Sequence, residues 1–145
     1  MAQDSSFARR TPYDKSVLNV VCWLLQIGLA AFLIVQSAIP LYQGGEYNIE
    51  TFERIGLGQW FRHFTATVEL VGAIGLLIPP LAGLAALGLV GVMIGAITTE
   101  LTVRTAAGAV LPAELLVLFA LVAWYRWPQT KALPDLVRRV LSRRR

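Results

Sequence analysis

Four long apolar stretches constrain most strongly how this chain can fold. A helix needs about 20 mostly apolar residues to cross a bilayer, with a usual range of about 17–25. The stretches that meet this requirement lie at about residues 17–39, 61–78, 81–99 and 109–127. None of them shows the alternation of a half-buried strand, and a backbone in lipid must satisfy its own hydrogen bonds. The sequence therefore predicts an all-α integral membrane protein with a four-helix bundle.

The amino-acid composition agrees with this fold class. Of the 145 residues, 56% are hydrophobic and 15% are charged, and the mean hydropathy is +0.60. Soluble domains carry roughly 25% charged residues. A chain with so little charge lacks the polar surface that a soluble domain of this length needs, and its size suits one domain.

The distribution of lysine and arginine predicts how the helices are oriented, because cytoplasmic segments are enriched in these residues. With both termini on one side of the bilayer, ten basic residues fall on that side and three on the other. The ten are Arg9, Arg10, Lys15, Arg126, Lys131, Arg138, Arg139, Arg143, Arg144 and Arg145, and the three are Arg54, Arg62 and Arg104. We therefore expect both termini in the cytoplasm, with an N-terminal arm at 1–16, a transmembrane domain at 17–127 and a tail at 128–145.

The tail has the pattern of an amphipathic helix. Its apolar residues recur at helical spacing, at Leu133, Leu136, Val137, Val140 and Leu141. Its polar face is basic, with Arg138, Arg139, Arg143, Arg144 and Arg145. Such a helix lies in the membrane interface and gains about 1 kcal/mol per basic residue from anionic lipid. The alternative is a tail that only fixes topology.

The net charge of +4 favours a membrane surface over nucleic acid as the partner, because the basic residues gather at the chain ends.

The second and third stretches should form a hairpin, because Pro79-Pro80 joins them almost without a loop. Both stretches are rich in small residues, which allow helices to approach closely in lipid. These residues are Gly72, Ala73 and Gly75 in the second stretch and Gly88, Gly91 and Gly95 in the third. They predict tight packing inside the bundle, or alternatively the contact face of a homodimer.

One carboxylate, Glu69, interrupts the second stretch. Ionisable residues inside a span are costly and indicate a functional site by default. The structural alternative is a pair with an arginine or a bond to a neighbouring helix. Burial would favour the neutral acid, whereas a nearby arginine would favour the carboxylate, and the sequence leaves this open.

Glu69 is the candidate catalytic residue. The candidate ligand-binding residues are Gln26, Arg62, Thr65, Glu69, Glu100 and Glu114, most of them expected at the outer mouth of the bundle. For Gln26 the favoured alternative is an interhelical hydrogen bond.

The sequence offers no self-sufficient redox or metal chemistry. Cys22 is the single cysteine, so neither an intramolecular disulfide nor a CxxC pair can form. His63 is the single histidine, which excludes a haem held by two histidines of this chain, and no metal site or cofactor motif is predicted.

Three functions remain, and the sequence leaves open whether the chain is an enzyme. The first is an accessory or anchoring membrane subunit that acts with a protein partner. The second is a quinone- or lipid-binding site around Glu69. The third is an oligomeric transporter, although four spans are few for one chain.

The stretch FRHFTATVELVGAIGLLIPPLAGLAALGLVGVMIGAITTEL, residues 61–101, resembles the DoxX-like family of small four-helix membrane proteins. The resemblance rests on Glu69, Gly72, Gly75, Met93 and Ala96: an acid, a small-rich apolar run, a short turn and a second small-rich helix. The resemblance implies a bacterial inner-membrane protein, sometimes associated with oxidoreductase systems. Many relatives carry histidine where this chain has Glu100, so the resemblance transfers no role to that position.

Overall fold

The computed structural model describes residues 12–142, including the side chains of residues 16–135, 138, 141 and 142. Most of the predicted N-terminal arm, the side chain of Arg139 and all of Arg143, Arg144 and Arg145 lie outside the described part. Within that part the chain is helical and contains no strand. The all-α fold predicted from the sequence is therefore confirmed for these residues.

The helices follow one another with short connections. In chain order they are α1 (Pro12–Phe32), the π-helical segment η1 (Leu33–Ala38), α2 (Ile39–Gln43), α3 (Glu46–Ile55), α4 (Gln59–Leu76), α5 (Pro79–Val103), the 3₁₀ segment η2 (Ala106–Ala109), α6 (Val110–Lys131) and α7 (Leu133–Ser142). Because α1, η1 and α2 follow without a break, the first helix continues through residue 43.

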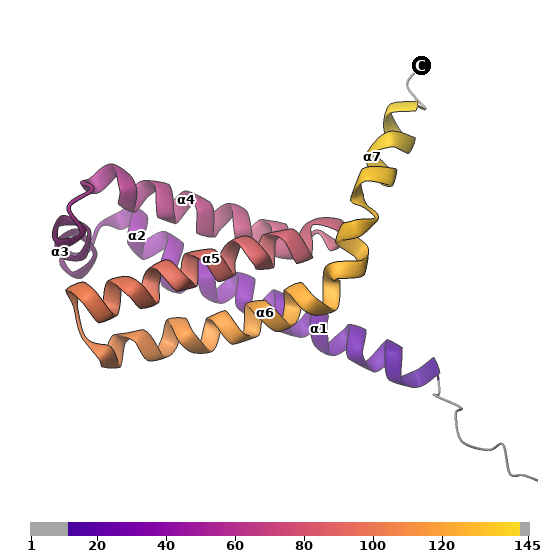
Figure 1. Cartoon of the computed structure of the whole chain (residues 1–145), viewed down its shortest axis with the longest axis horizontal. Helices are drawn as coiled ribbons and strands as arrows, with labels where there is room; N and C mark the ends of the chain where they lie inside the picture. Colours follow the sequence, from indigo (N-terminus) through magenta and orange to yellow (C-terminus); the bar gives the residue numbers. More distant parts are fainter. Residues whose placement is uncertain (1–11, 143–145) are drawn as a thin grey trace, which may run out of the picture.

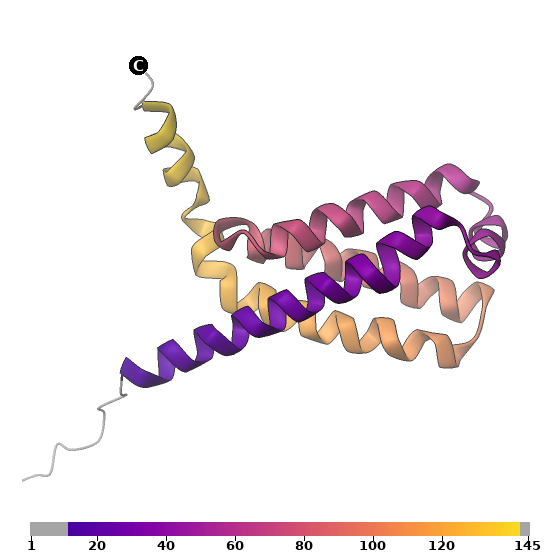
Figure 2. The ribbon, with the colours of Figure 1, turned by 180° about the vertical axis from the view of Figure 1, so that it is seen from behind.

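The long helices α1, α4, α5 and α6 pack against one another (Figures 1 and 2). The short helix α3 covers the end at which η2 joins α5 to α6. The α4–α5 turn, the start of α1 and helix α7 all lie at the opposite end. The predicted tail segment thus forms helix α7, which leaves the bundle next to the α4–α5 turn and points away from the start of α1. Its lipid contact stays a prediction.

The α4–α5 hairpin forms as the double proline predicts. Ile78 is extended, with φ −104° and ψ 107°, and Pro79 occupies the first turn of α5. A Cβ added to Gly72 would lie 2.7 Å from the side chain of Leu89, and one added to Gly75 would lie 2.8 Å from Ala85. These two glycines therefore allow α4 and α5 to approach closely, as expected for packing inside the bundle.

Three helices are long and apolar enough to cross a membrane. They are Ser16–Gln43, Pro79–Val103 and Ala106–Asp135, found among the described residues. Large apolar side chains on these helices point outward, among them Leu24, Leu87 and Val117, each about half exposed or more. An outer surface of this kind suits lipid. Helix α4 is not among the three, because charged residues and His63 lower its hydropathy.

Candidate functional site

Glu69 lies inside the bundle, on the face of α4 that meets the first helix. Its exposed fraction is 4%. The hydroxyl of Ser37, in η1, donates a hydrogen bond of 2.6 Å to Oε2 of Glu69. Among the described residues no lysine or arginine forms an ion pair with this carboxyl group. Of the alternatives drawn from the sequence, the bond to a neighbouring helix is therefore the one that forms.

The π-helical segment that holds Ser37 has a local cause in the sequence. Pro40 has no backbone N–H, so the carbonyl of Gln36 lacks its usual α-helical donor. A π-helix pairs each carbonyl with the N–H five residues later, and the N–H of Ile39 indeed donates to the carbonyl of Ile34. Short π-helical segments are rare and frequently mark functional sites. Here the segment positions Ser37, the side chain that bonds Glu69 among the described residues.

Two adjoining cavities meet at Glu69. The larger has a volume of about 570 Å³ and the smaller about 410 Å³. Both are lined by Ser37, Glu69, Ala96 and Pro112. Ligand sites are typically clefts of about 300–1,000 Å³ with apolar walls and a few placed polar groups. The space around this carboxyl group fits that description.

The glycines of α5 form one wall of the larger cavity. A Cβ added to Gly88, Gly91 or Gly95 would meet no atom within 4 Å. All three line the larger cavity, opposite apolar and aromatic side chains of α3 and α4. The tight packing expected for these three glycines is therefore absent from the described structure, and they leave room instead.

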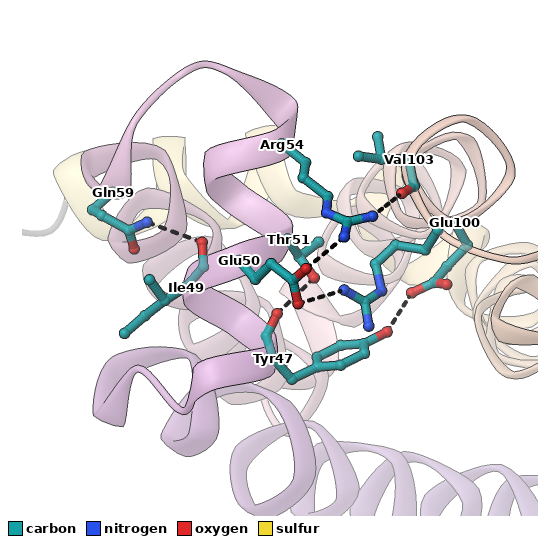
Figure 3. Close-up of polar contacts among 9 residues, drawn as sticks. Tyr47, Ile49, Glu50, Thr51, Arg54, Gln59, Glu100 and Val103 are labelled. Carbon is teal, nitrogen blue, oxygen red and sulfur yellow. Dashed lines mark hydrogen bonds and ion pairs between the residues drawn. The ribbon is translucent and has the colours of Figure 1, made fainter.

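Helix α3 closes one end of the larger cavity and is bonded to the end of α5. Figure 3 shows Tyr47 and Arg54 reaching from α3 to this end. The hydroxyl of Tyr47 donates to Glu100 at 2.9 Å, and Arg54 donates to the carbonyl of Val103 at 3.3 Å. Glu50 accepts from Arg54 and pairs with Arg104 at 3.5 Å.

Glycines at both ends of α3 permit its position across the bundle. Gly44, Gly56 and Gly58 have φ values of 68°, 81° and 82°, a region that favours glycine. They allow the chain to turn sharply into and out of α3. The short helix can therefore lie over the cavity, at the end of the bundle that the long helices form.

A second buried polar cluster lies toward the opposite end of the bundle, around Arg126 of α6. Its guanidinium is 1% exposed and donates to Gln26 and to Asn19, at 2.9 Å each. It also donates to Gln129 at 3.3 Å. Gln26 in turn donates to the carbonyl of Leu76 at the end of α4. We call Asn19, Gln26, Arg126 and Gln129 the arginine clamp, since they join α1, α4 and α6.

Three of the six candidate ligand-binding residues come together at one cavity. Thr65, Glu69 and Glu100 line the larger cavity. Gln26 belongs to the arginine clamp, so its interhelical role is the one observed. Glu114 is exposed on α6 and lines neither cavity. The expected convergence of these residues at one mouth is therefore only partial.

Arg62 bonds to the end of α2 rather than to Glu69. Its Nη1 donates to the carbonyl of Leu41, and its Nε donates to Gln59 at 2.8 Å. Carbonyls at a helix C-terminus lack intrahelical donors and attract cations. Arg62 therefore supports the turn before α3 and leaves Glu69 without a cationic partner among the described residues.

No group of three or more His, Cys, Asp or Glu side chains that could hold a metal ion occurs in the part of the chain that was searched. Cys22 is a buried free cysteine whose thiol lies 3.5 Å from Gln26.

A family model matches residues 24–122, a range that begins within α1 and ends within α6. The chain belongs to the DoxX-like family. Of the residues on which the resemblance rested, Glu69, Met93 and Ala96 line the smaller cavity, whereas Gly72 and Gly75 pack α4 against α5. Neither curated proteins nor solved structures gave a match to the chain.

Proposed function

We propose that this DoxX-like protein binds an apolar small molecule with one polar group, of quinone or lipid type, in the cavities beside Glu69. One observation carries the proposal: a carboxyl group that is 4% exposed forms the shared wall of two cavities and has Ser37 as its hydrogen-bond partner. A buried acid that served only to join helices would be enclosed by partners. Here Oε1 has no partner among the described residues and is left to a ligand.

The site would lie in the outer half of a membrane bundle. In this proposal α4 is the fourth span, both termini are cytoplasmic and the membrane is the bacterial inner membrane. The support is the excess of basic residues near the termini, the three apolar helices and the packing of α4 against two of them. A cysteine placed in α3 should react with a membrane-impermeant reagent from the periplasmic side, and labelling only in opened cells would contradict this orientation.

The binding proposal is tested on protein purified from its own membrane in a mild non-ionic detergent. Native mass spectrometry of the wild type should detect a small apolar molecule bound near one to one. Glu69→Gln should lose it, whereas the control Glu53→Gln, an exposed carboxylate on α3, should retain it. Gly91→Leu fills the open space on α5 without touching Glu69, so it should also release the molecule. A wild type that is empty and takes up no added apolar molecule would contradict the proposal.

The accessory role, which was the first of the three functions drawn from the sequence, becomes the second proposal, with a partner enzyme supplying the chemistry. It rests on the absence of a redox motif in the sequence and has a separate test. A protein partner that co-purifies in fixed ratio with both wild type and Glu69→Gln would support it, because the site and the partner contact would then be independent. Recovery of the chain without any partner would count against it. A transporter role would require an oligomer, and the native mass spectra would detect one.

A further inference from the structure

The ionisable side chains that line the larger cavity are acidic, whereas the chain as a whole has a net positive charge. The chain carries a net charge of +4, yet the acidic and basic side chains that line the cavities are two carboxylic acids, Glu69 and Glu100. No lysine, arginine or histidine is among the described lining residues. A site for a fatty acid or a phosphate head would need the opposite arrangement.

The basic residues near the cavity are bonded to other groups. Arg62 donates to Leu41 and Gln59, as described above. Arg104 pairs with Glu50, and its Cζ lies 3.8 Å from the ring centroid of Tyr47. Because these guanidinium groups already have partners, they do not offset the negative character of the cavity.

The remaining walls suit an apolar body with a cationic head. Phe61 and Phe64 stack with ring centroids 6.1 Å apart, and both line the larger cavity together with Phe52. Aromatic faces attract ammonium groups within about 6 Å. Beside them, Gly88 and Gly91 leave space in which an alkyl or ring system can lie.

We propose that the cavity beside Glu69 selects lipophilic cations, apolar molecules whose head is an ammonium group, over molecules with neutral or anionic heads. This inference rests on the proposed function, since it names the class of molecule for the same site. The carboxyl group of Glu69, with its Oε1 open to the cavity, is the proposed contact of the cationic head, and the aromatic side chains are its wall. An anionic head at the same place would lie beside the acid Glu69, with the acid Glu100 lining the same cavity and no basic lining residue to pair with, in a medium of low dielectric.

The test compares three probes that share one alkyl chain: lauryltrimethylammonium, lauryl alcohol and lauric acid. Their binding to detergent-solubilised protein is measured at neutral pH by native mass spectrometry and by competition with a fluorescent lipophilic cation. In the wild type the ammonium probe should bind at least about tenfold more tightly than lauric acid, with the alcohol between them. Glu69→Gln should reduce that ratio to within about threefold, and Glu53→Gln should leave it unchanged.

Further variants separate selectivity from binding itself. Gly91→Leu should weaken the binding of all three probes alike, because the leucine side chain occupies the space for their shared alkyl chain. Ser37→Ala keeps the carboxyl group and should keep the preference, so the inference stays testable if Glu69→Gln fails to fold. Lauric acid or the alcohol binding as tightly as the ammonium probe would overturn the inference and leave the proposed function intact. No saturable binding of any probe would overturn both.

Discussion

The first helix contacts two buried ionisable groups, and they differ in what surrounds them. Near the start of this helix, Asn19 and Gln26 bind the guanidinium of Arg126, and near its end Ser37 binds Glu69. Neither ionisable group forms an ion pair with a described residue. Nε and Nη1 of Arg126 donate to amide oxygens, and its buried Nη2 has no hydrogen-bond partner among the described residues. Arg126 lines neither cavity, while Glu69 borders both. Burial of a charge therefore does not by itself identify a site, whereas open space beside the charge does.

The two groups also differ in their relation to stability. Each amide oxygen that faces Arg126 would be left without its donor if the guanidinium were removed, and leaving a buried polar group unsatisfied costs about 1–3 kcal/mol. Glu69 has a single described hydrogen bond, from Ser37. We therefore expect the arginine clamp to stabilise the fold and the Glu69 region to tolerate change, and the following predictions test this difference.

The largest effect should come from Arg126→Met, which removes the charge and keeps most of the volume. Loss of the hydrogen bonds to Gln26 and Asn19 should lower the free energy of unfolding by about 2–4 kcal/mol. The measurement is unfolding in mixed micelles, followed by circular dichroism. The control is Arg138→Met, an exposed arginine on α7. Equal stability of the two variants would show that the clamp does not stabilise the fold.

The next effect separates packed glycines from open ones. In Gly72→Ala the new Cβ would meet Leu89 at 2.7 Å, and overpacking of this kind costs about 1–3 kcal/mol. In Gly91→Ala the new Cβ meets nothing within 4 Å, so the gain in helix propensity, up to about 1 kcal/mol, should remain. The same unfolding measurement should therefore give opposite signs, and a large loss for Gly91→Ala would mean that the α5 wall is packed in the membrane.

These contrasts show what the sequence could and could not predict. The length of the apolar stretches located the long helices, and the double proline predicted the hairpin that α4 and α5 form at Pro79. Because a carboxylate interrupts an apolar stretch, Glu69 could also be singled out. Which neighbour each small residue faces could not be predicted, because it depends on the rotation of each helix and on the distance between helices. Gly72 and Gly91 both lie in small-rich apolar stretches. Only the structure shows that a Cβ on Gly72 would meet Leu89 while one on Gly91 would meet nothing within 4 Å.

Two residues were missed as candidates for a site or a core contact, each for a physical reason. Arg126 lies near a predicted membrane interface, where arginine normally points to water and fixes topology. Its long side chain turns inward instead, to partners on α1 that are about a hundred residues away in sequence. Ser37 lies in the first apolar stretch, and the π-helical segment before Pro40 directs it to Glu69. A proline one turn after a polar residue was the available signal.

A smaller effect on stability is expected for Glu69→Gln. The amide oxygen of glutamine can still accept the hydrogen bond from Ser37, and no ion pair is lost among the described residues. The free energy of unfolding should change by less than about 1 kcal/mol. A loss as large as that of Arg126→Met would make Glu69 a structural group and remove the contrast between the two regions.

The smallest effect concerns α3, where the cavity end meets solvent. Burial, followed by the hydrogen bond to Glu100, raises the pKa of the Tyr47 phenol above its ordinary value of 10.0, while Arg104 lowers it. Because the folded-state pKa is raised, this contact stabilises the fold below about pH 10 and is lost as the pH rises through the pKa of Tyr47. Tyrosinate absorbance, with Tyr47→Phe subtracted, measures the titration.

Two variants of the same contact should move that titration in opposite directions. Glu100→Gln removes an acceptor and a negative charge, so the pKa of Tyr47 should fall toward 10.0. Arg104→Gln removes the cation that lies over the ring and should raise the pKa further. Unfolding below pH 10 should change little in either variant, since Tyr47 is half exposed. An unshifted titration in the wild type would mean that α3 is not held to α5 by this bond, and that the cavity is open at this end.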